Sequence, residues 1–149
     1  MSAATITVRL LGPTDAAVLE RVAADVFDKP VDGALAREFL DDPRHHLAVA
    51  IDAEGVVVGM ASAVHYIHPD KAAQLFINEV GVAPTHQGLG IGLRLVSELL
   101  ALGRSLDCTE AWVATEPGNQ AARALYEKAG GQEDDAPFVM YTFPFQEDR

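Results

Sequence analysis

The sequence predicts one α/β (α+β) domain in which helices flank a mixed, mostly antiparallel sheet. Its 149 residues suit one domain with a good core, and no linker or internal repeat divides residues 1–149. Short apolar runs that alternate or are rich in β-branched residues indicate strands, and longer runs with apolar residues three and four apart indicate helices. The predicted order of elements is βααβββαβαβ.

The first half of the chain predicts three strands and two helices. Gly12-Pro13-Thr14-Asp15 is typical of a helix start, and Leu19, Val22 and Val26 follow at helical spacing. Asp41-Asp42-Pro43 ends a second, short helix. The predicted elements are a strand over 5–10, a helix opened by 12–15, a helix over 34–40, and strands over 46–51 and 56–64 that a hairpin turn at 52–55 joins.

The second half predicts strands that alternate with helices. Leu89, Leu93, Val96 and Leu100 form one apolar stripe, which predicts a long helix lying against the sheet. Trp112 falls within a central strand and is expected in the core. The predicted elements are a strand over 74–82, a helix over 89–102, a strand over 111–115, a helix over 119–129, a closing strand over 138–145, and one more short strand near Gln132.

A glycine loop near mid-chain is the most informative segment. It reads Gln87-Gly88-Leu89-Gly90-Ile91-Gly92, between a predicted strand that ends at Val82 and a predicted helix that starts within the glycines. Glycines have no Cβ to hold a ligand away from the backbone amides. The first turn of a helix also carries unpaired N–H groups and the positive end of the helix dipole. The loop therefore predicts a cradle for a diphosphate.

Two common nucleotide loops lack a required residue in this chain. A Walker loop needs Gly-Lys-Ser/Thr, and Gly92-Leu93-Arg94 does not supply it. A dinucleotide-binding loop needs glycine where Leu93 stands and an acidic ribose partner at a strand end, whereas Glu110 lies at a strand start. Coenzyme A is a third option for a ligand with a diphosphate.

The loop belongs to a pair of motifs that resemble one family. Gln87-x-x-Gly90-x-Gly92 resembles the coenzyme A signature of the GNAT acetyltransferases. Downstream, Asn119-x-x-Ala122-x-x-Leu125-Tyr126-x-x-x-Gly130 resembles the second motif of that family at its usual distance. The resemblance spans the chain by element order and residues 77–131 position by position. It implies a GNAT fold, whose sheet is splayed between the fourth and fifth strands.

Within the family, the chain is similar to the small aminoglycoside 3-N-acetyltransferases. The similar segments are residues 9–13, 25–27, 125–130 and the acidic pair Glu133-Asp134. The chain departs from that group in a longer segment over 135–139, and Gln87 stands where arginine is commoner.

The resemblance implies acetyl-coenzyme A (acetyl-CoA) as the cofactor and names the residues that bind it. Asn119 would contact the pantetheine arm, although asparagine before a helix is also a preferred N-cap. Gly81 alone would indicate a β-bulge. The implied cofactor-binding residues are Val80, Gly81 and Val82, whose backbone pairs with the pantetheine arm, then Gln87, Gly88, Leu89, Gly90, Ile91 and Gly92 at the diphosphate, and Asn119 and Tyr126.

Two side chains are candidates for the chemistry. By resemblance, the Tyr126 hydroxyl gives a proton or a hydrogen bond to the departing thiolate, although a buried aromatic with a satisfied hydroxyl is the simpler interpretation. Glu79 is a carboxylate in an apolar strand, so it is a candidate general base, direct or through water, or an ammonium anchor. A solvated strand position is its alternative. Cys108 follows Asp107, which does not favour a reactive thiolate, so direct transfer is expected.

Composition bounds the partners and the location. A formal net charge of −11 disfavours nucleic acid and favours a cationic small-molecule amine, although solubility alone would also account for it. No apolar run reaches the roughly 20 residues of a membrane span, no signal peptide is recognisable, and the single cysteine excludes an internal disulfide, so a cytoplasmic, non-membrane protein is expected. The five histidines show no metal-ligand spacing. His86 is expected to be solvent-exposed, and contact with a phosphate is the alternative because it lies next to the glycine loop.

The expected function is acetyl-CoA-dependent N-acetylation of an aminoglycoside, at the 3-amino group. Two alternatives stay open: acetylation of another amine, such as a polyamine, an amino acid or a protein N-terminus, and a non-catalytic domain that binds coenzyme A. Members of the family are often dimers, so the resemblance also allows a homodimer.

Overall fold

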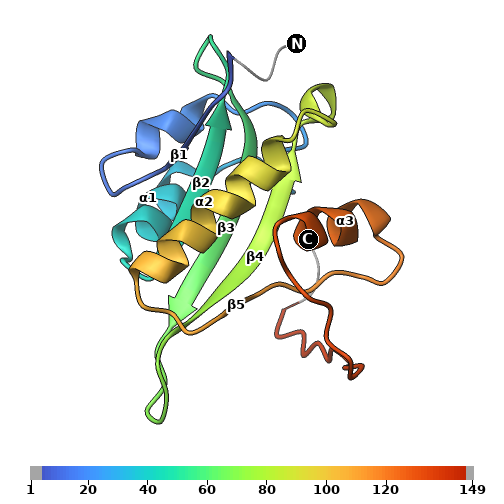
Figure 1. Ribbon diagram of the computed structural model, residues 1–149. Coiled ribbons are helices and arrows are strands. Elements are labelled where there is room, and N and C mark those ends of the chain that lie inside the picture. The colour runs from blue at the N-terminus through green and yellow to red at the C-terminus, as the bar shows by residue number, and fades with distance from the viewer. Residues whose placement is uncertain (1–4, 147–149) are drawn as a thin grey trace.

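The computed structural model describes residues 5–146 and holds a five-stranded sheet in the order β1-β2-β3-β4-β5 (Figure 1). Neighbouring strands are antiparallel except β4 and β5, which are parallel. The mixed, mostly antiparallel sheet that the sequence predicts is therefore confirmed. The strands are β1 (Thr7–Leu10), β2 (His45–Ile51), β3 (Val57–Tyr66), β4 (Gln74–Val82) and β5 (Ala111–Trp112).

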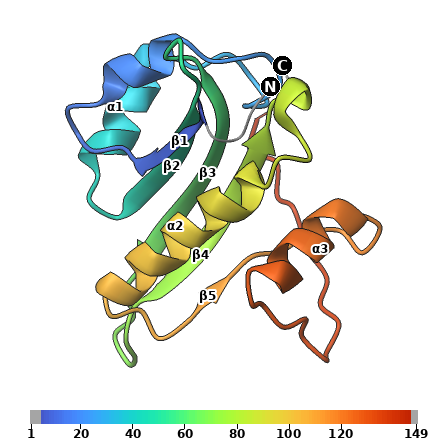
Figure 2. The ribbon, with the colours of Figure 1, turned by 45° about the horizontal axis from the view of Figure 1, so that its top comes forward.

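Helices lie on both faces of this sheet. The long helix α2 crosses one face, and the 3-10 helix η2 and the helix α1 lie on the other (Figures 1 and 2). The Asp32 side chain caps α1 by accepting a hydrogen bond from the Leu35 amide at 2.9 Å. The helical elements are η2 (Ala16–Glu20), α1 (Gly33–Asp41), η3 (Pro84–His86), α2 (Ile91–Ser105) and α3 (Gln120–Lys128).

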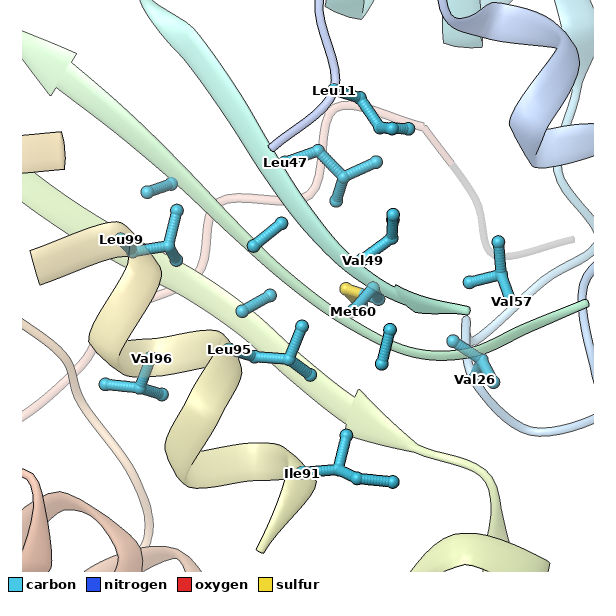
Figure 3. Packing of buried hydrophobic residues seen from close by; sticks show 14 of the residues in the cluster. Leu11, Val26, Leu47, Val49, Val57, Met60, Ile91, Leu95, Val96 and Leu99 are labelled. Carbon is cyan, nitrogen blue, oxygen red and sulfur yellow. The ribbon is translucent and has the colours of Figure 1, made fainter. Parts of the chain in front are cut away.

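The buried hydrophobic residues pack against both faces of the sheet (Figure 3). Leu95 and Leu99 of α2 are fully buried against the sheet, and Val49 and Met60 are buried on the opposite face. A Cβ added at Gly59 would lie 3.2 Å from both Ile91 and Leu95, so the missing side chain lets α2 approach β3. Burying each such leucine contributes about 1.5–3 kcal/mol, which anchors α2 firmly.

The predicted helix opened by residues 12–15 is wrong beyond its first turns. Only the 3-10 helix Ala16–Glu20 forms. Val22 instead makes an isolated parallel bridge to Val57, where the Ala23 amide donates to the Val57 carbonyl at 2.9 Å. Asp25 then adopts a left-handed φ of 66°. Pairing with β3 satisfies backbone groups that a helix would otherwise satisfy, so tertiary contact outweighs the helical spacing.

Strand β4 contains a β-bulge at Asn78, and not at Gly81 as predicted. Ser62 pairs with Glu79 and Ala63 pairs with Ile77, which leaves Asn78 as the extra residue, while Gly81 pairs regularly with Met60. A bulge shifts the alternation of faces by one position. Glu79 consequently shares the face of Gly81, away from α2.

The C-terminal quarter is more irregular than predicted. The strand expected over 111–115 keeps only Ala111–Trp112, and Trp112 is 44% exposed rather than buried. Residues 138–145 form no strand, and neither does the region of Gln132. Once β5 leaves β4, its backbone has no neighbouring strand to continue the ladder.

His46 and His65 form a stacked pair across β2 and β3. His46 Nε2 lies 2.7 Å from His65 Nδ1, and the ring centroids are 5.0 Å apart. Burial, and then the neighbouring His65 and His45, lower the pKa of His46 from its ordinary 6.5 to about 4. The carboxylate of Asp42 opposes this shift.

Stability is expected to fall as the pH drops from 6.5 to 4, because the unfolded chain binds a proton at His46 before the folded chain does. The stabilisation is complete above pH 6.5 and lost on acidification. For a half-buried ring, screened by solvent, we expect about 1–2 kcal/mol. Melting temperatures of wild type and His46→Phe, at pH 7 and pH 4.5, measure it. The melting temperature of the variant should fall less between pH 7 and pH 4.5 than that of the wild type. Equal falls in both proteins would mean that His46 does not cause the loss of stability in acid.

Candidate active site

A gap between β4 and β5 is the central feature of the site. The two strands pair only at Leu75–Ala111 and Phe76–Trp112. Beyond that point β5 runs toward α3 while β4 runs toward the start of α2, as Figures 1 and 2 show from two directions. The predicted splay is therefore present, and it leaves residues 77–82 of β4 without a strand on the β5 side within the described part of the chain.

The register tells which backbone groups face this gap. The Ala83 amide donates to the Val58 carbonyl at 2.8 Å, which makes that pair a hydrogen-bonded one. Bonded and non-bonded pairs alternate in an antiparallel ladder, so Gly81 bonds to Met60. The polar groups of Val80 and Val82 then point into the gap, and an extended ligand would pair with them.

Gly81 contributes space rather than hydrogen bonds. A Cβ at this position would lie 2.3 Å from the carbonyl oxygen of Val26, well inside van der Waals contact. The segment before α1 can therefore approach β4 closely only because residue 81 is glycine.

Gln87 links the gap to the glycine loop. Its side-chain Nε2 donates to the Val82 carbonyl at 3.1 Å. A ligand that pairs with Val82 would share or displace this bond, so Gln87 is placed to respond to occupancy of the gap.

The glycine loop has the geometry of an anion cradle. Gly88 and Gly90 have left-handed φ values of 80° and 77°, and an added Cβ at either would meet nothing within 4 Å. Gly90 is the N-cap of α2 and gives no side-chain cap, so the positive helix end is open to an anion. These features fit the diphosphate of coenzyme A.

The other residues of the glycine loop also contribute to the packing of the fold. The Ile91 side chain is buried in the core and Leu89 is half-buried, so both would reach a ligand through their amides. A Cβ at Gly92 would lie 3.3 Å from Leu125, so this glycine allows α3 to pack on α2.

Helix α3 brings Asn119 and Tyr126 to the β5 side of the gap. Asn119 Oδ1 accepts from the Ala122 amide at 3.1 Å, so it is the N-cap of α3. Tyr126 is half-buried, and its burial raises the pKa of its hydroxyl above the ordinary 10. Within residues 5–146 this hydroxyl has no hydrogen-bond partner. It is therefore a protonated donor available to a ligand.

Glu79 is exposed at the bulge and lies on the face opposite α2. Tyr126 belongs to α3, which packs on α2 through Leu125 and Gly92. The two candidate catalytic side chains thus come from opposite faces of the sheet, as an acid and a base on two sides of a reacting centre would.

A cleft that sequence reasoning missed opens between η2 and α1. Its volume is about 730 Å³, and its wall includes Asp25 and Phe27, the neighbours of Val26 that contacts Gly81. Three carboxylates and two cations line it, so its formal charge is only −1 (−3 + 2). The charged lining residues are Glu20, Asp25, Asp28, Lys29 and Arg37. The only sign of this cleft in the sequence is that these five charged residues all lie within residues 20–37.

His86 is not solvent-exposed as predicted. It is 3% exposed, and its Nδ1 lies 2.8 Å from the Thr85 hydroxyl. Its Nε2 has no partner among the described residues. The 3-10 turn of η3 directs this ring inward, an effect that sequence spacing does not reveal.

Cys108 is not poised as a nucleophile. Burial, and next the charge of Asp107, raise the pKa of its thiol. A protonated thiol reacts poorly. Within residues 5–146, no three or more His, Cys, Asp or Glu side chains gather as a metal would require, and no helix is long and apolar enough to span a bilayer.

Fold and motifs agree with comparisons to known proteins. The chain matches the model of the acetyltransferase (GNAT) family over residues 16–131. It is also 30% identical over 129 residues to the N-alpha-acetyltransferase RimI of Mycobacterium tuberculosis (strain ATCC 25618 / H37Rv), across 85% of this chain and 78% of that protein. The chain therefore belongs to the GNAT acetyltransferase family, and the site is that of an N-acetyltransferase.

The chain is also similar to acetyltransferases that are named for a different acceptor. The chain is 34% identical over 91 residues to an L-2,4-diaminobutyric acid acetyltransferase of Shouchella clausii (strain KSM-K16), across 61% of this chain. The match spans 48% of that protein, so about half of its length.

Solved structures support the fold. An aminoglycoside acetyltransferase, meta-AAC0020, from an uncultured soil metagenomic sample has a TM-score of 0.76 at 18% identity, over 95% of this chain and 99% of its own. The aminoglycoside N-acetyltransferase AAC(6')-Iy in complex with CoA has a TM-score of 0.71 at 18% identity, over 92% and 94%.

Proposed function

We propose that this chain transfers an acetyl group from acetyl-CoA to the nitrogen of a small amine. The observation that carries the proposal is the free β4 edge at Val80 and Val82, continuous with the open glycine loop at Gly88 and Gly90. When bound, acetyl-CoA supplies an activated thioester carbonyl. The loop amides hold its diphosphate, and the β4 edge aligns its extended arm along the gap.

Three proton and charge events accompany the transfer. The acceptor ammonium loses a proton, for which Glu79 is placed on one face, directly or through water. A carbon–nitrogen bond forms while the carbon–sulfur bond breaks. The Tyr126 hydroxyl gives its proton or a hydrogen bond to the sulfur that leaves. No acyl-enzyme is needed, in keeping with the protonated Cys108 thiol.

An aminoglycoside is the first candidate acceptor. The net charge of −11 attracts a polycation, and aminoglycoside acetyltransferases share the fold at TM-scores of 0.76 and 0.71. The neighbour AAC(6')-Iy is of the 6' type, so the proposal extends to aminoglycoside amines generally, with the 3-amino group as one position to test.

A diamino acid is the second candidate, and the cleft favours it. Carboxylates such as Asp25 suit an ammonium group, while Lys29 and Arg37 suit a carboxylate. A zwitterion meets both, whereas a polycation would be repelled by the two cations. The volume of about 730 Å³ admits either acceptor.

A thiol-release assay with acetyl-CoA and a panel of acceptors tests the proposal. The panel is gentamicin, 2,4-diaminobutyrate, spermidine and a peptide with a free N-terminus. Turnover with at least one small amine is expected. Calorimetric binding of coenzyme A without turnover of any acceptor would favour the non-catalytic alternative, and no binding would refute the site itself.

Two matched variants locate the acceptor. Asp25→Asn removes one cleft carboxylate and keeps a residue that tolerates the left-handed φ of 66°. Asp70→Asn removes the same charge from an exposed turn outside the cleft lining. Both variants remove one negative charge and so weaken the long-range field equally. Only Asp25→Asn removes a carboxylate from the cleft, so only that variant should raise KM for the acceptor.

A further inference from the structure

Two aromatic rings are stacked where β4 and β5 pair. The ring centroids of Phe76 and Trp112 are 4.3 Å apart, and the two residues are partners in the parallel ladder. The Trp112 indole Nε1 donates to the Tyr66 hydroxyl at 2.9 Å, which fixes the orientation of the indole. Trp112 is 44% exposed and Phe76 is half-buried, and both lie outside the buried core of residues 5–146. This pair, Phe76 and Trp112, is called the aromatic platform, and it offers ring surface to a ligand.

The platform lies on the same face of the sheet as Glu79. Met60 is on the face away from α2 (Figure 3), and Ser62 and Val64 follow it at alternate positions of β3. Val64 pairs with Phe76. Ser62 pairs with Glu79. Paired residues share a face, so Phe76 and Glu79 both point away from α2. They are three positions apart along β4 with one bulge between them, which is roughly 7–10 Å at about 3.3 Å per residue.

The surroundings of the platform favour a cation that is carried on an apolar frame. The face of an indole ring attracts an ammonium group, and its carbon surface packs against apolar groups. Glu79 lies beyond one end of the platform. At the other end, the Glu110 Oε1 accepts from the Gln74 Nε2 at 3.1 Å. Gln74 pairs with Tyr66, so this bond holds the Glu110 carboxylate beside the aromatic rings. A positively charged ligand therefore meets carboxylates at both ends.

The length of the acceptor decides whether it can use this surface. An acceptor that reacts at Glu79 must extend roughly 7–10 Å further to cover the platform. A four-carbon diamino acid is too short for this, whereas two or more linked aminosugar rings are long enough. Charge agrees with length, because Lys29 and Arg37 in the cleft between η2 and α1 repel a polycation. The cation near the platform along the chain, Lys71, is paired with Asp70 at 3.3 Å.

We propose that the aromatic platform is an acceptor subsite, which binds a non-reacting ring of a polycationic aminosugar while the reacting nitrogen lies at Glu79. The inference rests on the proposed function for the place of the reacting nitrogen. The apolar face of the sugar ring stacks on Trp112, and its ammonium groups lie over the indole and beside Glu110. Neither platform ring touches the reacting atoms, so the subsite contributes to acceptor affinity and leaves kcat unchanged.

Fluorescence of Trp112 tests the subsite without any turnover. Trp112 is the only tryptophan of the chain, so its emission reports on the platform. Gentamicin and kanamycin, which have no aromatic ring, are titrated into the full chain with saturating coenzyme A. A saturable change in emission is expected with both, and none with 2,4-diaminobutyrate. No change with either aminoglycoside, or an equal change with 2,4-diaminobutyrate, would overturn the proposal.

Two variants of Trp112 separate the aromatic ring from the fold. Trp112→Ala should raise the dissociation constant of gentamicin about 5–30-fold in calorimetry and leave that of coenzyme A unchanged. Trp112→Phe keeps an aromatic face without the bond to Tyr66, so it should stay within about threefold of wild type. Melting temperatures of both variants show whether the fold persists. An equal loss of affinity in the two variants would assign the effect to the lost hydrogen bond and contradict the subsite.

A matched control and the kinetics complete the test. Ile67→Ala removes an apolar side chain that is 63% exposed and lies outside the platform, so gentamicin should bind as it does to wild type. Binding at Trp112 without acetyl transfer would refute the proposed function and support the subsite. Acetylation of gentamicin with the same KM in wild type and Trp112→Ala would refute the subsite and support the proposed function.

Discussion

Replacing Tyr126 by phenylalanine is expected to lower kcat for acetyl transfer about 10²-fold or more, the usual contribution of a positioned general acid. The variant removes only the hydroxyl and keeps the ring, which packs half-buried on α3. In the proposed function, the β4 edge and the glycine loop carry most of the contacts to coenzyme A, so its dissociation constant should change little. Steady-state kinetics and calorimetry measure the two quantities separately.

The pH profile gives a second readout for Tyr126. Burial raises the pKa of its hydroxyl above 10, so the donor form persists through neutral and mildly alkaline pH. Deprotonation of Tyr126 should therefore cause no loss of rate at neutral or mildly alkaline pH. Tyr66→Phe is the control, since that phenol accepts a bond from the Trp112 indole and should leave kcat unchanged. Full activity in Tyr126→Phe would eliminate the proton-donor role.

The parts of the fold that periodicity determines are those that the sequence predicts well. β2, β3 and β4 are apolar strands in a hairpin series, and α2 has a sustained apolar stripe, so local pattern and burial agree. The glycine loop was predictable because it also depends on a local property: glycine readily adopts the left-handed φ found at Gly88 and Gly90.

The remaining features depend on contacts between distant segments. The 3-10 helix ends where Val22 meets Val57, and the bulge lies at Asn78 because of how β3 and β4 align. The inward direction of His86 and the cleft between η2 and α1 likewise arise from packing. A spacing rule applied along one chain contains no such information, so sequence reasoning could not find the cleft between η2 and α1.

Replacing Gly81 by alanine is expected to lower the free energy of unfolding by about 2–3 kcal/mol, the cost of an overpacked position that cannot relax freely. The new Cβ would lie 2.3 Å from the Val26 carbonyl oxygen, a backbone atom that no side-chain rotation can move. For a chain of 149 residues the melting temperature should fall by about 5–10 °C. Thermal denaturation followed by circular dichroism measures this change.

The same substitution should also affect the site, because Val26 lies between Asp25 and Phe27 of the cleft wall. If the acceptor binds in this cleft as proposed, moving that segment to relieve the clash should raise KM for the acceptor and leave the dissociation constant of coenzyme A unchanged. Gly118→Ala is the matched control, since an added Cβ there meets nothing within 4 Å and its φ is not left-handed. That variant should be as stable as wild type or gain about 0.4–1 kcal/mol. If both variants have the melting temperature of the wild type, the close approach of the Val26 segment to β4 does not constrain this fold.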